Sequence, residues 1–209
     1  MSGIIFVGGA GGVGKTTLSK ELASLNKDFN YFNFFACMRK EAGVCSDGER
    51  LKKWQGLQGL LITNQITPLI SNDASIIFDT HYSFQSDGGP EVAFAKRGFD
   101  PTVPAELTFC QNFVSVIADL KIPTIAILLR ANPGEILRRR LRDLKSRPST
   151  CLSIESIVKE QDTEESCWRE FQESMERLNI ALFLKKFDNV AHPTTTATLL
   201  SHEIRDFMK

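Results

Sequence analysis

The segment near the N-terminus constrains the fold more than any other part of this 209-residue chain. An apolar run, Ile-Ile-Phe-Val, leads into a glycine-rich stretch at residues 8–14, and a segment with helical character starts at Lys15. Gly9, Gly14, Lys15 and Thr16 stand at the spacing of the GxxxxGK[ST] pattern. The sequence therefore predicts a strand, a phosphate-binding glycine loop and a helix, in that order.

Each part of this loop has an expected role in holding a nucleoside triphosphate. Glycines let the main chain approach a ligand closely, and the N–H groups at a helix N-terminus attract phosphate. Lys15 is expected to contact the β and γ phosphates, and the Thr16 hydroxyl to hold Mg²⁺. We therefore expect ATP as the nucleotide and Mg²⁺ as the cofactor. The residues expected to bind the nucleotide are Gly9, Gly11, Gly12, Val13, Gly14, Lys15, Thr16 and Thr17.

Composition limits the classes of protein that fit. Hydrophobic residues make up 42% of the chain, which is enough for the core of one α/β domain. The formal net charge of zero gives no overall basic surface for nucleic acid. No apolar run reaches transmembrane length and no signal-peptide pattern is recognisable, so we expect a cytoplasmic protein without membrane contact. The five scattered cysteines favour reduced thiols over disulfides or a metal site.

Strand-like and helix-like segments alternate along the chain, which predicts an α/β fold with a doubly wound, five-stranded parallel sheet and helices on both faces. The expected strands are residues 3–7, 30–34, 75–79, 124–129 and 182–187. The expected helices include residues 15–25, 49–71, 107–120, 133–144, 154–178 (one long helix or a broken pair) and 198–208. Residues 82–104 are rich in Gly, Pro and polar side chains, which predicts a long functional loop. The oligomeric state stays open.

A second group of residues with catalytic character follows the apolar run at residues 75–78. Asp79 at the end of this strand is expected to face the phosphates, where it can hold Mg²⁺ together with Thr16 or orient the attacking oxygen. His81 either binds the acceptor or forms a hydrogen bond within its own loop. We therefore predict Asp79 as a catalytic and metal-binding residue and His81 as a substrate-binding one.

Positive charges gather in two further places. Four arginines and one lysine lie between residues 138 and 145, and such a density favours contact with a phosphoryl group, although the spacing does not say which side chains point inward. Arg39 and Arg50 flank a Gly-containing turn. They are candidates for binding the acceptor, with an ordinary surface role as the alternative.

With these residues in place, the chain resembles the archaeal-type adenylate kinases, a branch of the P-loop nucleoside monophosphate kinases. The resemblance extends over most of the sequence. It rests on the glycine loop at residues 8–17, on Phe34–Ala42, on Ser46–Lys53, on Asp79-Thr80-His81, on Ala131–Leu141 and on Phe187–Asn189.

The resemblance implies transfer of the γ-phosphoryl group of ATP to a nucleoside monophosphate within a single domain, residues 1–209. It implies an acceptor-binding region at about residues 36–72, a substrate loop at about 82–104 and a lid at about 138–153. In this family comparison Lys15 stabilises phosphates, Arg139 and Arg142 are catalytic lid residues, Arg147 is a lid residue that binds substrate, and Asn189 lies near the adenine.

Departures from the family leave the acceptor open. Residues 82–104 look longer than the family's corresponding loop, and the arginines after Asp143 do not align cleanly. A nucleoside or another hydroxyl compound, including a modified base in DNA, remains an alternative acceptor. The loop also resembles that of the partition and nitrogenase-iron-protein switch ATPases. Their signature Lys is replaced here by Ala10, so we favour a kinase over a nucleotide-dependent switch.

Overall fold

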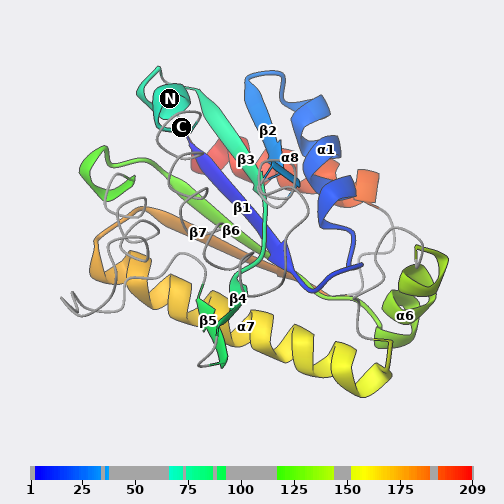
Figure 1. The fold of residues 1–209 in the computed structure, drawn as a ribbon. Helices are drawn as coiled ribbons and strands as arrows, with labels where there is room; N and C mark the ends of the chain where they lie inside the picture. The colour runs from blue at the N-terminus through cyan, green and yellow to red at the C-terminus, as the bar shows by residue number, and fades with distance from the viewer. Residues whose placement is uncertain are drawn as a thin grey trace.

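The computed structural model describes residues 3–33, 36–37, 66–72, 74–86, 89–92, 117–143, 152–188 and 193–208. A five-stranded sheet with the strand order β2-β3-β1-β6-β7 forms its centre, and every neighbouring pair is parallel (Figure 1). The strands are β1 (Ile4–Gly9), β2 (Phe29–Asn33), β3 (Ser75–Asp79), β6 (Thr124–Leu129) and β7 (Leu182–Phe187). The predicted α/β class and the five-stranded parallel sheet are therefore confirmed.

The three inner strands are continuous apolar runs because both of their faces are covered. Every residue of β1, β3 and β6 is buried. The central strand β1 pairs Ile4 with Ile76 on one side and with Thr124 on the other. This double pairing places the glycine loop, which follows β1, in the middle of the sheet edge.

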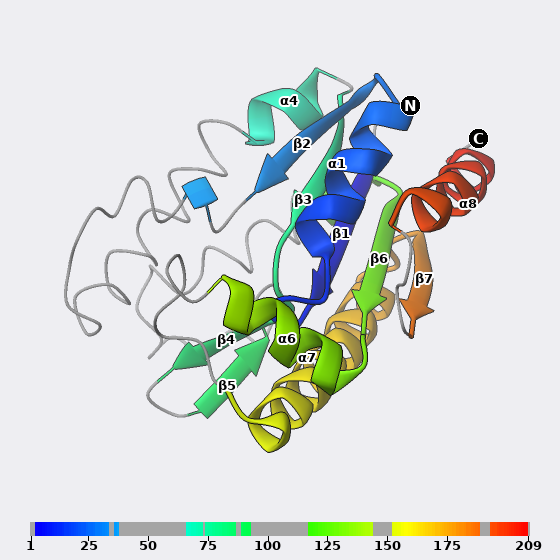
Figure 2. The ribbon, with the colours of Figure 1, turned by 90° about the vertical axis from the view of Figure 1, so that its right-hand side faces the viewer.

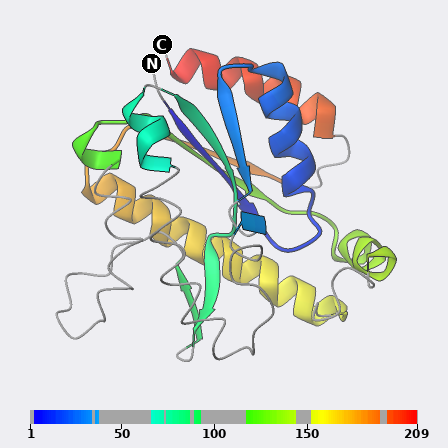
Figure 3. The ribbon, with the colours of Figure 1, turned by 45° about the horizontal axis from the view of Figure 1, so that its top comes forward.

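Helices form a layer on each face of the sheet. Helices α1 (Lys15–Leu25) and α8 (Pro193–Phe207) cover one face, and the long helix α7 (Ile154–Arg177) covers the other (Figure 3). Phe6 belongs to the core on the α7 side, where its ring lies 5.1 Å from that of Phe171. Val7, the next residue, belongs to the opposite core with Leu18 of α1. This alternation is the two-residue period of a strand buried on both faces.

The carboxyl ends of all five strands lie at one edge of the sheet, where ligands bind in folds of this kind. Helix α6 (Pro133–Arg142) follows β6 at this edge and lies beside the glycine loop (Figure 2). Asn132 caps α6, since its side chain accepts a hydrogen bond of 2.9 Å from the Gly134 N–H. The N-terminal half of α7 packs against α6, so both helices border the loop.

Several sequence predictions need correction. Part of the stretch expected as a loop forms an antiparallel strand pair, β4 (Ser83–Ser86) with β5 (Gly89–Val92). Gly and Pro are also common where two short strands are joined, so their presence did not exclude a strand pair. Helix α8 begins five residues earlier than expected, with Pro193 at a position where a helix tolerates proline. Of the two forms expected for residues 154–178, the structure has the single long helix, over residues 154–177.

The remaining described element is the short helix α4 (Thr67–Ser71), which packs against β3. It lies within the helix expected over residues 49–71, most of which falls outside the described residues. No helix in the described part of the chain is long and apolar enough to span a bilayer.

Candidate functional site

The glycine loop leaves β1 at Gly9 and returns into α1 at Lys15. Gly9 has a φ of 134°, and a Cβ atom there would lie 2.3 Å from the Leu129 carbonyl oxygen. Gly14, with a φ of 108°, precedes the first residue of α1 and adopts the left-handed conformation. Both positions therefore require glycine, as the motif predicts.

The ammonium group of Lys15 lies on one side of this loop, which we call the inner side. Lys15 is only 8% exposed, and its Nζ donates to the carbonyl oxygens of Gly9 at 2.5 Å and Ala10 at 3.1 Å. A single positive charge is thus held on the inner side of the loop, at the N-terminus of α1. Both the charge and the helix end favour an anion at this place.

A buried carboxylate lies opposite the first turn of α1. Asp79, the last residue of β3, is 3% exposed, and its Oδ2 accepts hydrogen bonds from Thr16 Oγ1 at 2.6 Å and from Asn33 Nδ2 at 2.6 Å. Tyr31 also donates to this oxygen, at 3.2 Å. Burial, followed by the neighbouring negative charge of Asp79, raises the pKa of Tyr31 to about 12, so this phenol remains a donor at neutral pH.

The donor set at Thr16 and Asp79 fits a hard divalent cation, because Mg²⁺ prefers carboxylate and hydroxyl oxygens and keeps several water ligands. A cation held here would lie beside the inner side of the glycine loop. Within the described ranges no group of three or more His, Cys, Asp or Glu side chains is placed to hold a metal. Thr16 and Asp79 together with phosphate oxygens remain the expected set.

Arginines of α6 contact the outer side of the glycine loop. Nη1 of Arg139 donates to the carbonyl oxygens of Gly12 and Val13, at 3.1 and 3.2 Å. Arg140 has a side chain that is only 2% exposed, and it donates to the Gly11 carbonyl oxygen through Nη2 at 2.7 Å and Nε at 3.0 Å. The predicted residue Arg142 is exposed at the end of the helix.

Sequence reasoning missed Arg140 and its partner Glu160 on α7, whose Oε2 lies 2.6 Å from Arg140 Nη2. One signal was present in the sequence. Arg140 stands one helical turn after Ile136, which is fully buried, so the two side chains share the inward face of α6.

A second glutamate of α7 holds the chain that leaves β3. Glu164 is 1% exposed, and its carboxylate lies 3.1 Å from His81 Nδ1 and accepts from the Tyr82 N–H at 2.9 Å and the Ser83 hydroxyl at 2.7 Å. Burial alone would raise the pKa of Glu164, but the charge and hydrogen bond of His81, together with the charge of Lys15, lower it to about 2. Glu164 therefore stays ionised and fixes the position of His81, which follows Asp79 by two residues.

Of the other residues predicted to belong to the site, one is described by the structure and four are not. Thr17 is described and is exposed in the first turn of α1. Arg39, Arg50, Arg147 and Asn189 lie outside the described residues, as do most of the expected acceptor-binding region and residues 144–151 of the expected lid. Their roles remain predictions.

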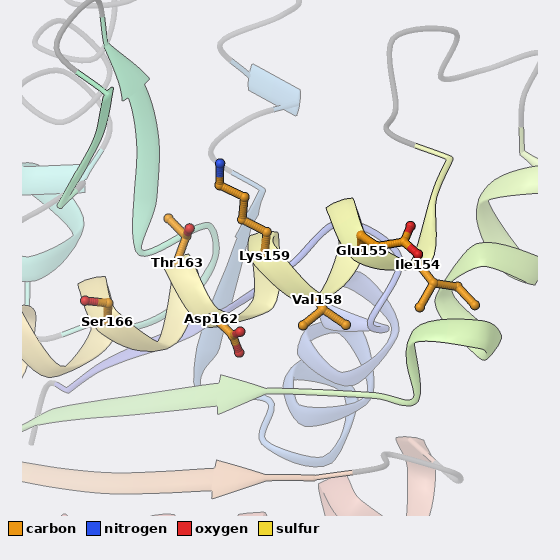
Figure 4. A pocket seen from close by; sticks show the side chains of 7 residues that line it. All are labelled: Ile154, Glu155, Val158, Lys159, Asp162, Thr163 and Ser166. Carbon is orange, nitrogen blue, oxygen red and sulfur yellow. The ribbon is translucent and has the colours of Figure 1, made fainter.

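A hollow of about 600 Å³ lies along the outer surface of α7 (Figure 4). The described residues that line it all belong to α7, and the side chains of Lys159 and Asp162 point to different sides of the helix. No residue of the glycine loop, of β3 or of α6 contributes to this lining, so the hollow is separate from the site around Lys15 and Asp79.

No family model matches the chain. Two curated proteins are similar to it, both of them archaeal adenylate kinases. The adenylate kinase of Thermococcus kodakarensis is 26% identical over 167 residues, which covers 76% of this chain and 74% of the relative. The adenylate kinase of Pyrococcus abyssi is 27% identical over 171 residues, covering 78% and 76%. The expected resemblance to the archaeal-type adenylate kinases is therefore confirmed, and with it the expected enzyme class, a kinase.

Two solved structures share the fold. A candidate kinase from Chloroflexus aurantiacus superimposes with a TM-score of 0.59 at 14% identity, covering 98% of this chain and 97% of that one. The tunicamycin resistance protein of Deinococcus radiodurans gives a TM-score of 0.51 at 14% identity, covering 98% and 96%. At this identity they support the P-loop kinase architecture and nothing more specific.

Proposed function

We propose that this chain, whose sequence resembles the archaeal adenylate kinases and whose fold is that of the P-loop kinases, transfers the γ-phosphoryl group of ATP to a nucleoside monophosphate. The bond between the γ phosphorus and its bridging oxygen to the β phosphorus breaks. A new bond forms to a phosphate oxygen of the acceptor, and the products are ADP and a nucleoside diphosphate. The two adenylate kinases that resemble this chain support the choice of acceptor.

One observation carries the proposal for the donor side. The Thr16 hydroxyl and the Asp79 carboxylate lie 2.6 Å apart, next to a loop whose inner side holds the Lys15 ammonium. Phosphoryl transfer requires positioning and stabilisation of negative charge more than covalent chemistry. These three side chains supply both at the carboxyl edge of the sheet.

The roles of the residues follow from their positions. The N–H groups of the loop and Lys15 would bind and orient the phosphates, so that the reacting phosphorus stays in one place. Thr16 and Asp79 would hold Mg²⁺, which neutralises charge on the phosphate oxygens when bound. His81, which follows Asp79 by two residues and contacts Glu164, would border the acceptor.

A screen for ADP release tests the acceptor. The full chain is incubated with ATP and Mg²⁺ and with one acceptor at a time, drawn from nucleoside monophosphates, nucleosides and short DNA. The proposal predicts that one or more monophosphates stimulate ADP release. Stimulation by a nucleoside or by DNA alone would contradict the monophosphate acceptor. Absence of stimulation by every class would favour a slow nucleotide-dependent switch.

A further inference from the structure

A closed ring of hydrogen bonds joins the glycine loop to α6 and α7. The Gly11 N–H donates to Glu160 Oε1 at 2.7 Å, and the carbonyl oxygen of the same residue accepts from Arg140 Nη2 at 2.7 Å. The two side chains are themselves paired, Arg140 Nη2 to Glu160 Oε2, at 2.6 Å. Arg140 and Glu160, called the brace below, thus hold both polar backbone groups of one loop residue.

The brace lies at the point where the peptide groups of the loop change direction. A trans peptide is planar, so the N–H of each residue points opposite to the C=O of the residue before it. The Ala10 carbonyl points to Lys15 on the inner side, and the Gly11 N–H of the same peptide correspondingly points outward to Glu160. In the next peptide the Gly11 carbonyl points outward to Arg140, which turns the Gly12 N–H inward.

The following two peptides keep this second direction. Arg139 binds the carbonyl oxygens of Gly12 and Val13 on the outer side, so the N–H groups of Val13 and Gly14 face inward. The Val13 N–H lies 3.4 Å from the Ala10 carbonyl oxygen, which Lys15 also contacts. Three consecutive N–H groups therefore face the side on which the Lys15 ammonium lies.

We propose that Arg140 and Glu160 are positioning residues that hold the glycine loop in its phosphate-binding form before any nucleotide arrives. The proposal rests on the proposed use of the loop for ATP, and it adds two residues that act through the backbone of Gly11. The brace fixes the two peptide groups of Gly11 and with them the inward direction of the Gly12 N–H, while Arg139 fixes the Val13 and Gly14 N–H groups that follow. Pre-organisation of this kind raises affinity because less ordering is left to occur on binding.

The first test compares two double variants of the full chain. Arg140→Met with Glu160→Met removes both charges together, so neither is left buried without its partner. The matched control is Arg138→Met with Glu155→Met, which removes one exposed arginine of α6 and one exposed glutamate of α7; the ion-pair partner of Arg138 is Glu135 of its own helix. The dissociation constant for MgADP is measured by calorimetry at a temperature where circular dichroism shows every protein folded.

The brace variant is expected to bind MgADP about tenfold more weakly than the wild type, since charged hydrogen bonds to the loop are lost. The control is expected to stay within about twofold, and Glu160→Gln, which keeps an acceptor oxygen for Gly11, is expected to retain most of the affinity. A folded brace variant that binds MgADP as tightly as the wild type would overturn the proposal.

The second test needs no variant. In the wild type labelled with ¹⁵N-glycine, the Gly11 N–H is expected to exchange slowly without nucleotide and to shift little when MgADP is added. The Gly12 and Gly14 N–H signals are expected to shift strongly. The reverse pattern, with the largest shift at Gly11, would contradict the brace. Absence of any MgADP binding by the wild type would instead refute the proposed function, while slow exchange at Gly11 would still support the brace.

Discussion

The Thr16 hydroxyl lies 2.6 Å from Oδ2 of Asp79 and so joins the first turn of α1 to the end of β3. The two residues are 63 positions apart in sequence, yet β1 and β3 pair in register and end at the same edge of the sheet. Asn33 from β2 binds the same oxygen. Three chain segments thus converge on one buried carboxylate, which is the central feature of the proposed donor site.

Replacement of Asp79 by Asn tests its role as a metal ligand. The side chain keeps its size but loses the negative charge that attracts Mg²⁺. We expect phosphoryl transfer to fall by about 100-fold or more and the half-saturating Mg²⁺ concentration to rise. A Mg²⁺ titration of the steady-state rate measures both. Asp162→Asn, at an exposed carboxylate of α7, is the control and should behave as the wild type.

Lys15→Ala removes the positive charge from the inner side of the loop. Nζ of Lys15 donates to carbonyl oxygens of the loop, and Lys15 belongs to neither apolar core, so the sheet and both cores are expected to remain folded. Phosphoryl transfer is expected to fall by at least about 100-fold, because charge developing on the phosphate oxygens loses its nearest donor. Lys27→Ala, an exposed lysine beyond α1, serves as the control. An unchanged turnover number in Lys15→Ala would exclude this role.

The buried carboxylate of Glu164 predicts that the free energy of unfolding depends on pH in the acidic range. The pKa of Glu164 is lowered from the usual 4.5 to about 2. The ionised carboxylate therefore contributes fully to the free energy of unfolding above pH 4.5, and this contribution is lost as the pH falls toward 2. The shift corresponds to about 3 kcal/mol. Urea unfolding from pH 7 to pH 3 should therefore show the wild type losing stability relative to Glu164→Gln. A difference between the two proteins that does not change with pH would contradict the assignment.

Packing at the edge of the sheet gives a prediction about stability alone. A Cβ atom at Gly8 would lie 2.2 Å from the ring of Tyr82, which is fully buried and held by its hydroxyl at the Phe6 and Ile127 carbonyl oxygens. Gly8→Ala is expected to lower the free energy of unfolding by about 1–3 kcal/mol because the ring has no room to move.

Gly3→Ala is the matched control for this substitution. Its Cβ atom would also lie 2.2 Å from a neighbour, but that neighbour is the terminal methyl group of Met208, which can rotate away. Thermal or urea unfolding of both variants should show a clearly smaller loss for Gly3→Ala. Equal losses would mean that Tyr82 is not held rigidly.

Much of the proposed donor site was predictable because local sequence patterns determine where its residues lie. The GxxxxGK[ST] spacing identified Lys15 and Thr16, and an apolar run that ends in an aspartate identified Asp79. The strands at residues 75–79, 124–129 and 182–187 have the predicted bounds, and the first two are mainly apolar runs with clear ends.

The partners that α6 and α7 supply were not predictable from the same patterns. Arg139, Arg140 and Arg142 are the same residue type, and only the position of Arg140 one turn after Ile136 hints that it is buried while Arg142 is exposed. Glu160 and Glu164 belong to a helix with many charged residues; Glu164 stands one turn before the buried Trp168, but the sequence does not say which backbone groups either carboxylate binds. Tertiary packing determines which of these charged side chains face the glycine loop.

The most direct test of the central claim follows the label from γ-³²P-ATP with and without nucleoside monophosphates. Transfer at the site of Lys15, Thr16 and Asp79 predicts that the label appears in a nucleoside diphosphate with wild-type protein and not with Lys15→Ala. Release of the label as inorganic phosphate, at a rate that no monophosphate changes, would contradict the claim.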